Sequence, residues 1–159
     1  MASLKIAVTK KGDSVLLSLT GLVDESAAFP KIEFGEAKIA IIVWSGVTLI
    51  NSCGIREWVK WLGTFPQGVR IAYAHCPRII VDQINMVDGF LPKGGTTLSF
   101  FVPYYCNDCS AVTNLLFTNG KEFTGSNIAA PETVKCSKCG KVAELDVMES
   151  KYFKFLKAG

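Results

Sequence analysis

Four cysteines in the second half of the chain have the spacing of a metal site. Cys106 and Cys109 form one Cys-x-x-Cys pair, and Cys136 and Cys139 form a second pair, which Gly140 follows. Two residues between cysteines let both thiolates of a tight turn reach one ion at about 2.3 Å, and two such turns complete a tetrahedron. Four cysteine ligands leave no open coordination position. We therefore predict a structural zinc site that supports folding and takes no part in catalysis.

Other uses of these cysteines remain. An iron–sulfur centre takes the same four ligands, so the sequence leaves zinc and iron open. A thioredoxin-like redox pair opens a helix that follows a strand, and neither pair lies in such a place. Disulfides are the weaker interpretation, because the N-terminus has no export-type apolar segment and cytosolic cysteines stay reduced.

The longest apolar run, 39–44, is far shorter than the roughly 20 residues that span a bilayer. We expect a cytoplasmic protein without a membrane segment.

Positive and aromatic residues near the cysteines raise the possibility of nucleic-acid binding. Lysines surround the second pair, and aromatic residues are nearby: Lys135, Lys138 and Lys141, with Tyr104, Tyr105, Phe117 and Phe123. Exposed aromatics beside lysines suit single-stranded nucleic acid. The net charge of +3 is small, however, which favours aromatics in the core of a small ribbon and lysines in solvent. A nucleic-acid-binding zinc ribbon with the rest of the chain as a scaffold is the alternative function.

Cys53 and His75 are the other residues whose types could do chemistry. Both follow strands predicted to be parallel, at the edge where open α/β sheets place their sites. A cysteine near a helix N-terminus can have a lowered pKa, and a histidine can act as its base. The sequence offers no third orienting residue, no oxyanion loop and no phosphate-binding glycine motif. We predict that Cys53 is a small buried hydrophobe, that His75 leads into the next helix, and that the protein is not an enzyme.

The first hundred residues have the pattern of an α/β fold. Residues 4–9 alternate between apolar and polar, as in a half-buried strand, whereas 38–44 is an unbroken apolar run typical of a strand covered on both faces. A helical stripe at i, i+3, i+4 and i+7 follows Ser52. We predict a mixed β-sheet with helices packed on it. The predicted strands are 4–9, 15–19, 38–44, 69–74 and 97–102, and the predicted helices are a short one over 25–32, 52–62 and 77–88.

A change of composition after residue 104 indicates a second unit. Short polar and aromatic stretches, glycines and the cysteine pairs replace the long apolar segments. The separation of the two cysteine pairs requires a hairpin or hairpin pair between them. The predicted organisation is an α/β domain over 1–103, a zinc-ribbon insertion over 104–147, and a C-terminal helix over 148–159 that packs back on the first domain.

Ser52 lies where a strand is predicted to lead into a helix. Serine is a good N-cap residue, and we predict that Ser52 caps this helix. A phosphate on Ser52 would meet free backbone N–H groups and the positive end of the helix dipole. The site is therefore suited to carry added negative charge.

Three segments resemble motifs of the STAS family, the anti-sigma factor antagonists and their relatives. Residues 51–55, Asn-Ser-Cys-Gly-Ile, resemble the phosphoacceptor motif Asp-Ser-Ser/Thr-Gly-Leu. Residues 19–24, Leu-Thr-Gly-Leu-Val-Asp, resemble the family's Leu-Thr-Gly-Glu-Leu-Asp, and 76–90 resembles its third helix. The element order also agrees, so the resemblance covers residues 4 to about 102 and implies a STAS-like sheet.

The resemblance also implies a function and site residues. Ser52 matches the phosphorylated serine, and Asp24 matches the acidic residue at the start of the first helix. Asn51 replaces the usual aspartate and Cys53 replaces the second Ser or Thr, while Gly54 is retained. The implied function is regulatory and non-enzymatic: signal transduction or transcription regulation by binding another protein, an anti-sigma factor or kinase-like regulator, through these five residues. The zinc ribbon lies outside the minimal family.

Overall fold

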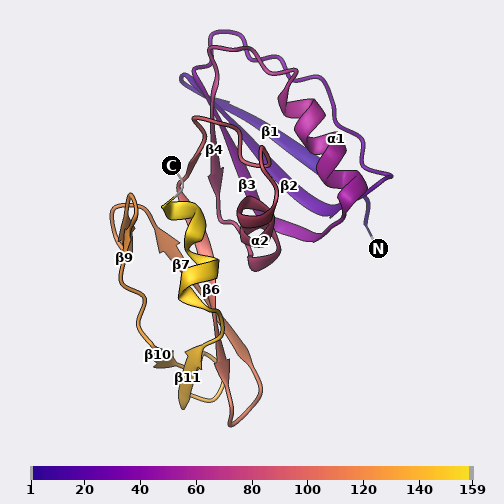
Figure 1. The fold of residues 1–159 in the computed structure, drawn as a ribbon. Helices are drawn as coiled ribbons and strands as arrows, with labels where there is room; N and C mark the ends of the chain where they lie inside the picture. The colour runs from indigo at the N-terminus through magenta and orange to yellow at the C-terminus, as the bar shows by residue number, and fades with distance from the viewer. Residues whose placement is uncertain (1, 158–159) are drawn as a thin grey trace.

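The computed structural model describes residues 2–157 and contains two main sheets. Figure 1 shows the first sheet with helices α1 and α2 in one half of the molecule. The second sheet, a small hairpin and the C-terminal turns make up the other half. The predicted mixed α/β class is confirmed.

The first sheet has the strand order β1-β2-β3-β4-β5. β1 and β2 form an antiparallel hairpin, and β2, β3, β4 and β5 are parallel neighbours. The two parallel crossovers that contain helices are those expected from the sequence. The elements of this half are β1 (Lys5–Lys11), β2 (Ser14–Val23), β3 (Ile39–Ile50), α1 (Ser52–Leu62), β4 (Arg70–Ala74), α2 (Arg78–Met86) and β5 (Thr96–Thr97).

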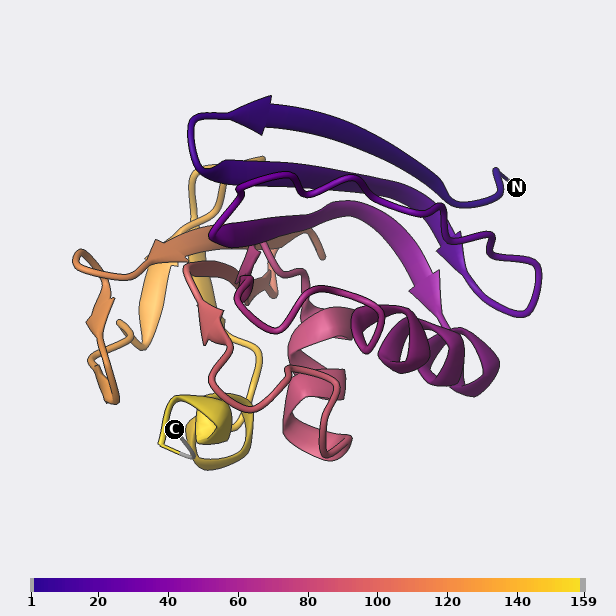
Figure 2. The ribbon, with the colours of Figure 1, turned by 90° about the horizontal axis from the view of Figure 1, so that it is seen from above.

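Both helices lie on the same face of this sheet, as Figure 2 shows, and large aromatic side chains fill the space between. Trp44 of β3 and Trp58 of α1 are fully buried with ring centroids 4.7 Å apart. The indole N–H of Trp58 donates to the Tyr73 hydroxyl at 2.9 Å, and this hydroxyl donates to the carbonyl of Phe90. Burial of such rings is the main source of stability in this half.

Two expectations for this half are wrong. No helix forms over 25–32, where Pro30 interrupts the segment; the chain is irregular there, and the Trp61 indole N–H donates to the Pro30 carbonyl at 2.8 Å. β3 is also not buried on both faces. Ala40, Ile42 and Trp44 are fully buried under the helices, whereas alternate residues on the opposite face are only half-buried: Ile39, Ile41 and Val43.

The second sheet is antiparallel with the order β10-β11-β6-β7. The strand predicted over 97–102 is divided between the sheets, because the chain leaves β5 after Thr97 and starts β6 at Ser99. The domain boundary predicted between residues 103 and 104 therefore lies within β6. A hairpin or hairpin pair is predicted between the cysteine pairs, and one short hairpin over 123–128 lies there. The strands are β6 (Ser99–Cys106), β7 (Val112–Thr118), β8 (Phe123–Thr124), β9 (Asn127–Ile128), β10 (Thr133–Lys135) and β11 (Val142–Leu145).

The C-terminal segment is two short turns, α3 (Glu149–Tyr152) and η1 (Lys154–Leu156), and not the one helix predicted. Asn85 of α2 explains the break. Its amide donates to the carbonyl of Tyr152 at 3.0 Å and accepts from the N–H of Phe155 at 2.9 Å, so it replaces helical hydrogen bonds.

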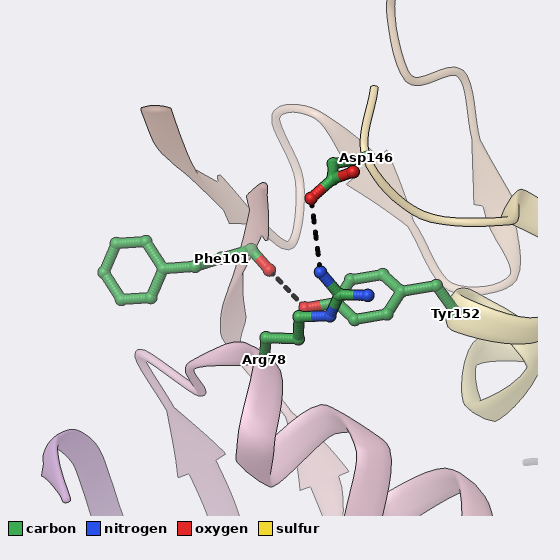
Figure 3. Close-up of polar contacts among 4 residues, drawn as sticks. All are labelled: Arg78, Phe101, Asp146 and Tyr152. Carbon is green, nitrogen blue, oxygen red and sulfur yellow. Dashed lines mark hydrogen bonds and ion pairs between the residues drawn. The ribbon is translucent and has the colours of Figure 1, made fainter. Parts of the chain in front are cut away.

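Figure 3 shows two polar contacts near the C-terminal segment, one within the second half and one between the two halves. The Tyr152 hydroxyl donates to the carbonyl of Phe101 in β6 at 2.6 Å. Arg78 at the start of α2 pairs with Asp146, which follows β11, at 3.4 Å. The segment thus packs against both α2 and β6.

Candidate metal centre and the surface around Ser52

The four cysteines predicted as ligands come together at one end of the second sheet. Cys106 ends β6, Cys109 lies in the turn before β7, and Cys136 and Cys139 lie in the turn between β10 and β11. All four sulfurs lie within 4.8 Å of one another. The Sγ atoms of Cys106 and Cys139 are 3.5 Å apart, and those of Cys109 and Cys136 are 3.6 Å apart. A tetrahedron with metal–sulfur bonds of about 2.3 Å has edges of about 3.8 Å, so the four sulfurs fit one metal ion.

The two cysteine turns have the same backbone conformation. In each turn the backbone N–H of the first cysteine donates to the carbonyl of the residue five positions later. The carbonyl of the same cysteine accepts the N–H of the residue four positions later. The bonds are Cys106 N to Ala111 O (3.0 Å) and Ser110 N to Cys106 O (2.8 Å), and Cys136 N to Lys141 O (2.6 Å) and Gly140 N to Cys136 O (3.0 Å). The fifth residue has a left-handed φ in both, 63° at Ser110 and 77° at Gly140. The sequence indicated this role for Gly140, but Ser110 gives no such signal.

Backbone amides and one buried threonine support the second turn. N–H groups of Cys139 and Lys138 aimed at the Cys136 sulfur lower the pKa of this thiol to about 6 and so favour the thiolate that binds metal. Thr113 of β7 is buried, and its hydroxyl accepts the N–H of Ser137 at 3.0 Å and contacts the Ser137 hydroxyl at 3.1 Å. Thr113 was not predicted, because a threonine in a strand is unremarkable in sequence.

The aromatic residues near the metal centre belong mainly to the core. Tyr104, Phe117 and Phe123 are buried, as predicted, and Tyr105 is half-buried. The surrounding lysines, Lys135, Lys138 and Lys141, are exposed. Three of the four aromatic rings are therefore not free to stack on nucleic-acid bases.

Asn51, and not Ser52, caps helix α1. The Asn51 side-chain oxygen accepts the N–H of Gly54 at 2.9 Å, and Asn51 has the extended backbone of an N-cap residue. Ser52 is the first helical residue and is exposed. The predicted cap is wrong by one residue, because an asparagine placed just before the serine reaches the third N–H of the helix. Within residues 2–157, the Ser52 hydroxyl forms no hydrogen bond.

Gly54 lets the helix start approach the end of β2. The backbone N–H of Asn51 donates to the carbonyl of Val23 at 3.1 Å. A Cβ atom on Gly54 would lie 1.9 Å from that same carbonyl oxygen, a distance that no side chain can adopt. The glycine of the motif is thus required by close contact between two backbones.

This approach brings the acidic segment after β2 beside the Ser52 segment. The Asn51 amide donates to the Glu25 carboxylate at 2.9 Å. Asp24 accepts bonds from the N–H of Ser26 at 3.0 Å and its hydroxyl at 2.7 Å, which fixes a turn. The segments that contain Asp24 and Asn51 are therefore neighbours, and Glu25, which directly follows Asp24, is a contact that sequence reasoning missed.

The structure does not join Cys53 and His75. The sequence predicted that Cys53 is buried, but the structure shows that it is only half-buried. His75 is exposed with a left-handed φ of 52°, its N–H donates to the Ser99 hydroxyl at 2.8 Å, and its ring lies 6.3 Å from that of Phe101. Among residues 2–157, no hydrogen bond links the two side chains. The sixth cysteine, Cys76, is fully buried, and burial raises the pKa of its thiol.

Comparison of the sequence with protein-family models gives no match, and comparison with curated proteins gives none. In the described part of the chain, no helix has the length and apolar character needed to cross a membrane.

Proposed function

We propose that this protein is a non-enzymatic, STAS-like regulatory domain that binds another protein through the surface around Ser52. This surface consists of Asp24, Asn51, Ser52, Cys53 and Gly54, with Glu25 beside them. In the same proposal, the four cysteines hold one structural zinc ion. The implied partner is an anti-sigma factor or a kinase-like regulator.

The observation that carries the proposal is the position of Ser52. Its exposed hydroxyl lies on the first residue of α1, where backbone N–H groups and the helix dipole favour negative charge. A phosphate there would add a charge of about −2 to the surface where the partner docks. The segment is tied by two backbone contacts to the end of β2, so added charge acts on a fixed surface.

The order of the elements supports the same family, with one difference. A hairpin followed by parallel strands with α1 and α2 on one face agrees with the resemblance in sequence. The first helix of the family is replaced by the irregular segment between β2 and β3. Asp24 therefore begins a turn here and not a helix.

Glu25 bears on the loss of the usual aspartate. Asn51 occupies the aspartate's position, but its amide holds the Glu25 carboxylate at 2.9 Å. A carboxylate is thus supplied from the neighbouring segment. Two versions of the proposal follow: a binder switched by phosphorylation of Ser52, and a constitutive binder that keeps the surface without the switch.

The test is quantitative capture of the physiological partner with purified, zinc-loaded baits. Wild type and Ser52→Ala are expected to bind equally, because Ser52 is not the helix cap and its removal leaves stability within about 0.5 kcal/mol. Ser52→Asp is expected to weaken binding strongly, because the added charge opposes a partner that docks with carboxylates. Ser150→Asp, which adds the same charge at an exposed serine of α3, is the matched control.

Equal partner affinity of wild type, Ser52→Ala and Ser52→Asp would contradict both versions. Incubation with a cognate kinase then separates them: a phosphate on Ser52 that releases the partner supports the switch, and an unmodified Ser52 supports the constitutive binder.

A further inference from the structure

A large cavity lies where three segments from both halves of the molecule meet. Its volume is about 820 Å³, and it is lined by the loop over 87–95, strand β5, the β8–β9 hairpin and the C-terminal turn η1. Ser52 follows the carboxyl end of β3, whereas the loop over 87–95 precedes the amino end of the parallel strand β5. The cavity and the Ser52 surface are therefore at opposite ends of the first sheet, and one does not depend on the other.

One part of the cavity lining is apolar. Side chains from α2, the following loop, β8 and η1 contribute: Ile84, Val87, Leu91, Phe123, Phe155 and Leu156. Phe123 is buried, and Phe155 and Leu156 are half-buried. Such a surface suits the apolar body of a small molecule.

The charged part of the lining is mostly positive. The lining contains three lysines, Lys93 on the loop and Lys154 and Lys157 near the C-terminus, and one carboxylate, Asp88. Within residues 2–157 none of these lysines forms an ion pair, and all three are exposed. Three cationic groups around a concave site attract an anion, because the field of like charges adds inside the cleft.

Uncharged polar residues also belong to this lining. Asn119 and Ser126 line the same cavity and offer further polar atoms.

We propose that this cavity binds a small organic anion that carries an apolar body and one phosphate or carboxylate group. The lysines bind the anionic group, the apolar side chains contact the body, and Asn119 and Ser126 offer hydrogen bonds to its polar atoms. This is a binding site separate from the Ser52 surface and from the metal centre.

The experiment uses the zinc-loaded full chain and the fluorescent probe 8-anilinonaphthalene-1-sulfonate, which combines apolar rings with one anionic group. Saturable binding at one site is expected. The double variant Lys93→Ala/Lys154→Ala should bind about tenfold more weakly, because it loses charge-assisted contacts. Lys10→Ala/Lys11→Ala removes the same charge from β1, outside the cavity, and should bind as wild type does.

Competition then distinguishes the two classes of ligand. Displacement of the probe by adenosine monophosphate supports a phosphorylated ligand with a ring, and displacement by octanoate supports an aliphatic carboxylate. Shifts of the backbone amides of Gly94 and Thr97 on addition of the competitor are expected in either case. Absence of saturable binding, equal affinity of wild type and the Lys93/Lys154 variant, or displacement by neither competitor would overturn the proposal.

Discussion

The two halves of the molecule are stabilised by different means. In the first sheet, Trp44, Trp58, Tyr73 and Phe90 are fully buried together, and α1 and α2 cover them. The second sheet has a smaller set of buried rings around Phe100, and its far end is held by four cysteines. A small sheet that lacks enough apolar surface to bury needs a further constraint, and the four cysteines could supply it by holding a metal ion.

Short strands are more numerous in the second half, although β5 of the first sheet also has only two residues. β2 and β3 contain 10 and 12 residues, whereas β10 contains three, and β8 and β9 contain two each. Strands this short are not stable without packing or a crosslink. Loss of the metal should therefore destabilise the second half, and loss of a buried aromatic ring should destabilise the first half.

The largest effect is expected on removal of the metal. Cys136→Ser should lose the ion and unfold the end of the second sheet, because structural zinc contributes on the order of 10 kcal/mol to such small sites. The first sheet should keep its fold. Metal analysis of the wild type should give one zinc per chain, and amide NMR spectra should show the changes confined to the second half.

Cys53→Ser is the matched control, since Cys53 lies outside the cluster, and it should retain the full metal content. Iron in place of zinc in the wild type would change the identity of the ion but not its structural role. Less than half an equivalent of any metal, under reducing conditions without chelator, would contradict the site.

The second expected effect is on the first half alone. Trp44→Ala removes a fully buried ring and should lower the free energy of unfolding by about 3–5 kcal/mol. Metal content should not change. Leu49→Ala on the same strand is the control, because Leu49 is 39% exposed and its loss should cost about 0.5 kcal/mol or less. Chemical denaturation of the zinc-loaded proteins measures both, and equal losses would contradict the assignment of the core.

The features that were predicted correctly from the sequence are those whose geometry depends on residue spacing alone. Two Cys-x-x-Cys pairs gave the four residues of the metal cluster, and apolar periodicity gave β1 to β4, α1 and α2. Contacts between distant segments could not be predicted. Asn85 breaks the C-terminal helix by bonding Tyr152 and Phe155, residues 67 and 70 positions away, and no local pattern marks that role.

The errors near Ser52 have the same physical origin. Asn51 and Ser52 are both good N-cap residues, and the choice between them depends on contacts of Asn51 with Glu25 and Val23. The apolar run over 97–102 likewise fits one strand, but the chain changes sheets at Leu98, where its N–H bonds to Tyr73 and the next residues pair with β7. Tertiary contacts decide between options that are equivalent locally.

The smallest expected effect concerns a contact inside the second half, between the C-terminal turns and β6. Tyr152→Phe removes the hydroxyl that donates to Phe101 at 2.6 Å, and should lower the free energy of unfolding by about 1 kcal/mol at neutral pH. Burial raises the pKa of Tyr152 above its usual range, and nearby Asp82 adds to this while Arg78 opposes it. The folded protein therefore keeps the phenolic proton at a pH where the unfolded chain has released it. Its contribution to stability is complete below about pH 10 and decreases above that value by about 1.4 kcal/mol per pH unit.

The pH dependence separates this tyrosine from the rest of the protein. Burial also raises the pKa of Tyr73, but Tyr73 is present in both proteins and its effect cancels in the comparison. Between pH 10 and 11, wild-type stability should fall more steeply than that of Tyr152→Phe, so the difference between the two proteins should shrink or reverse. Denaturation series at closely spaced pH values measure this. Parallel pH profiles for the two proteins would show that Tyr152 is not buried at the contact between α2, β6 and the C-terminal turns.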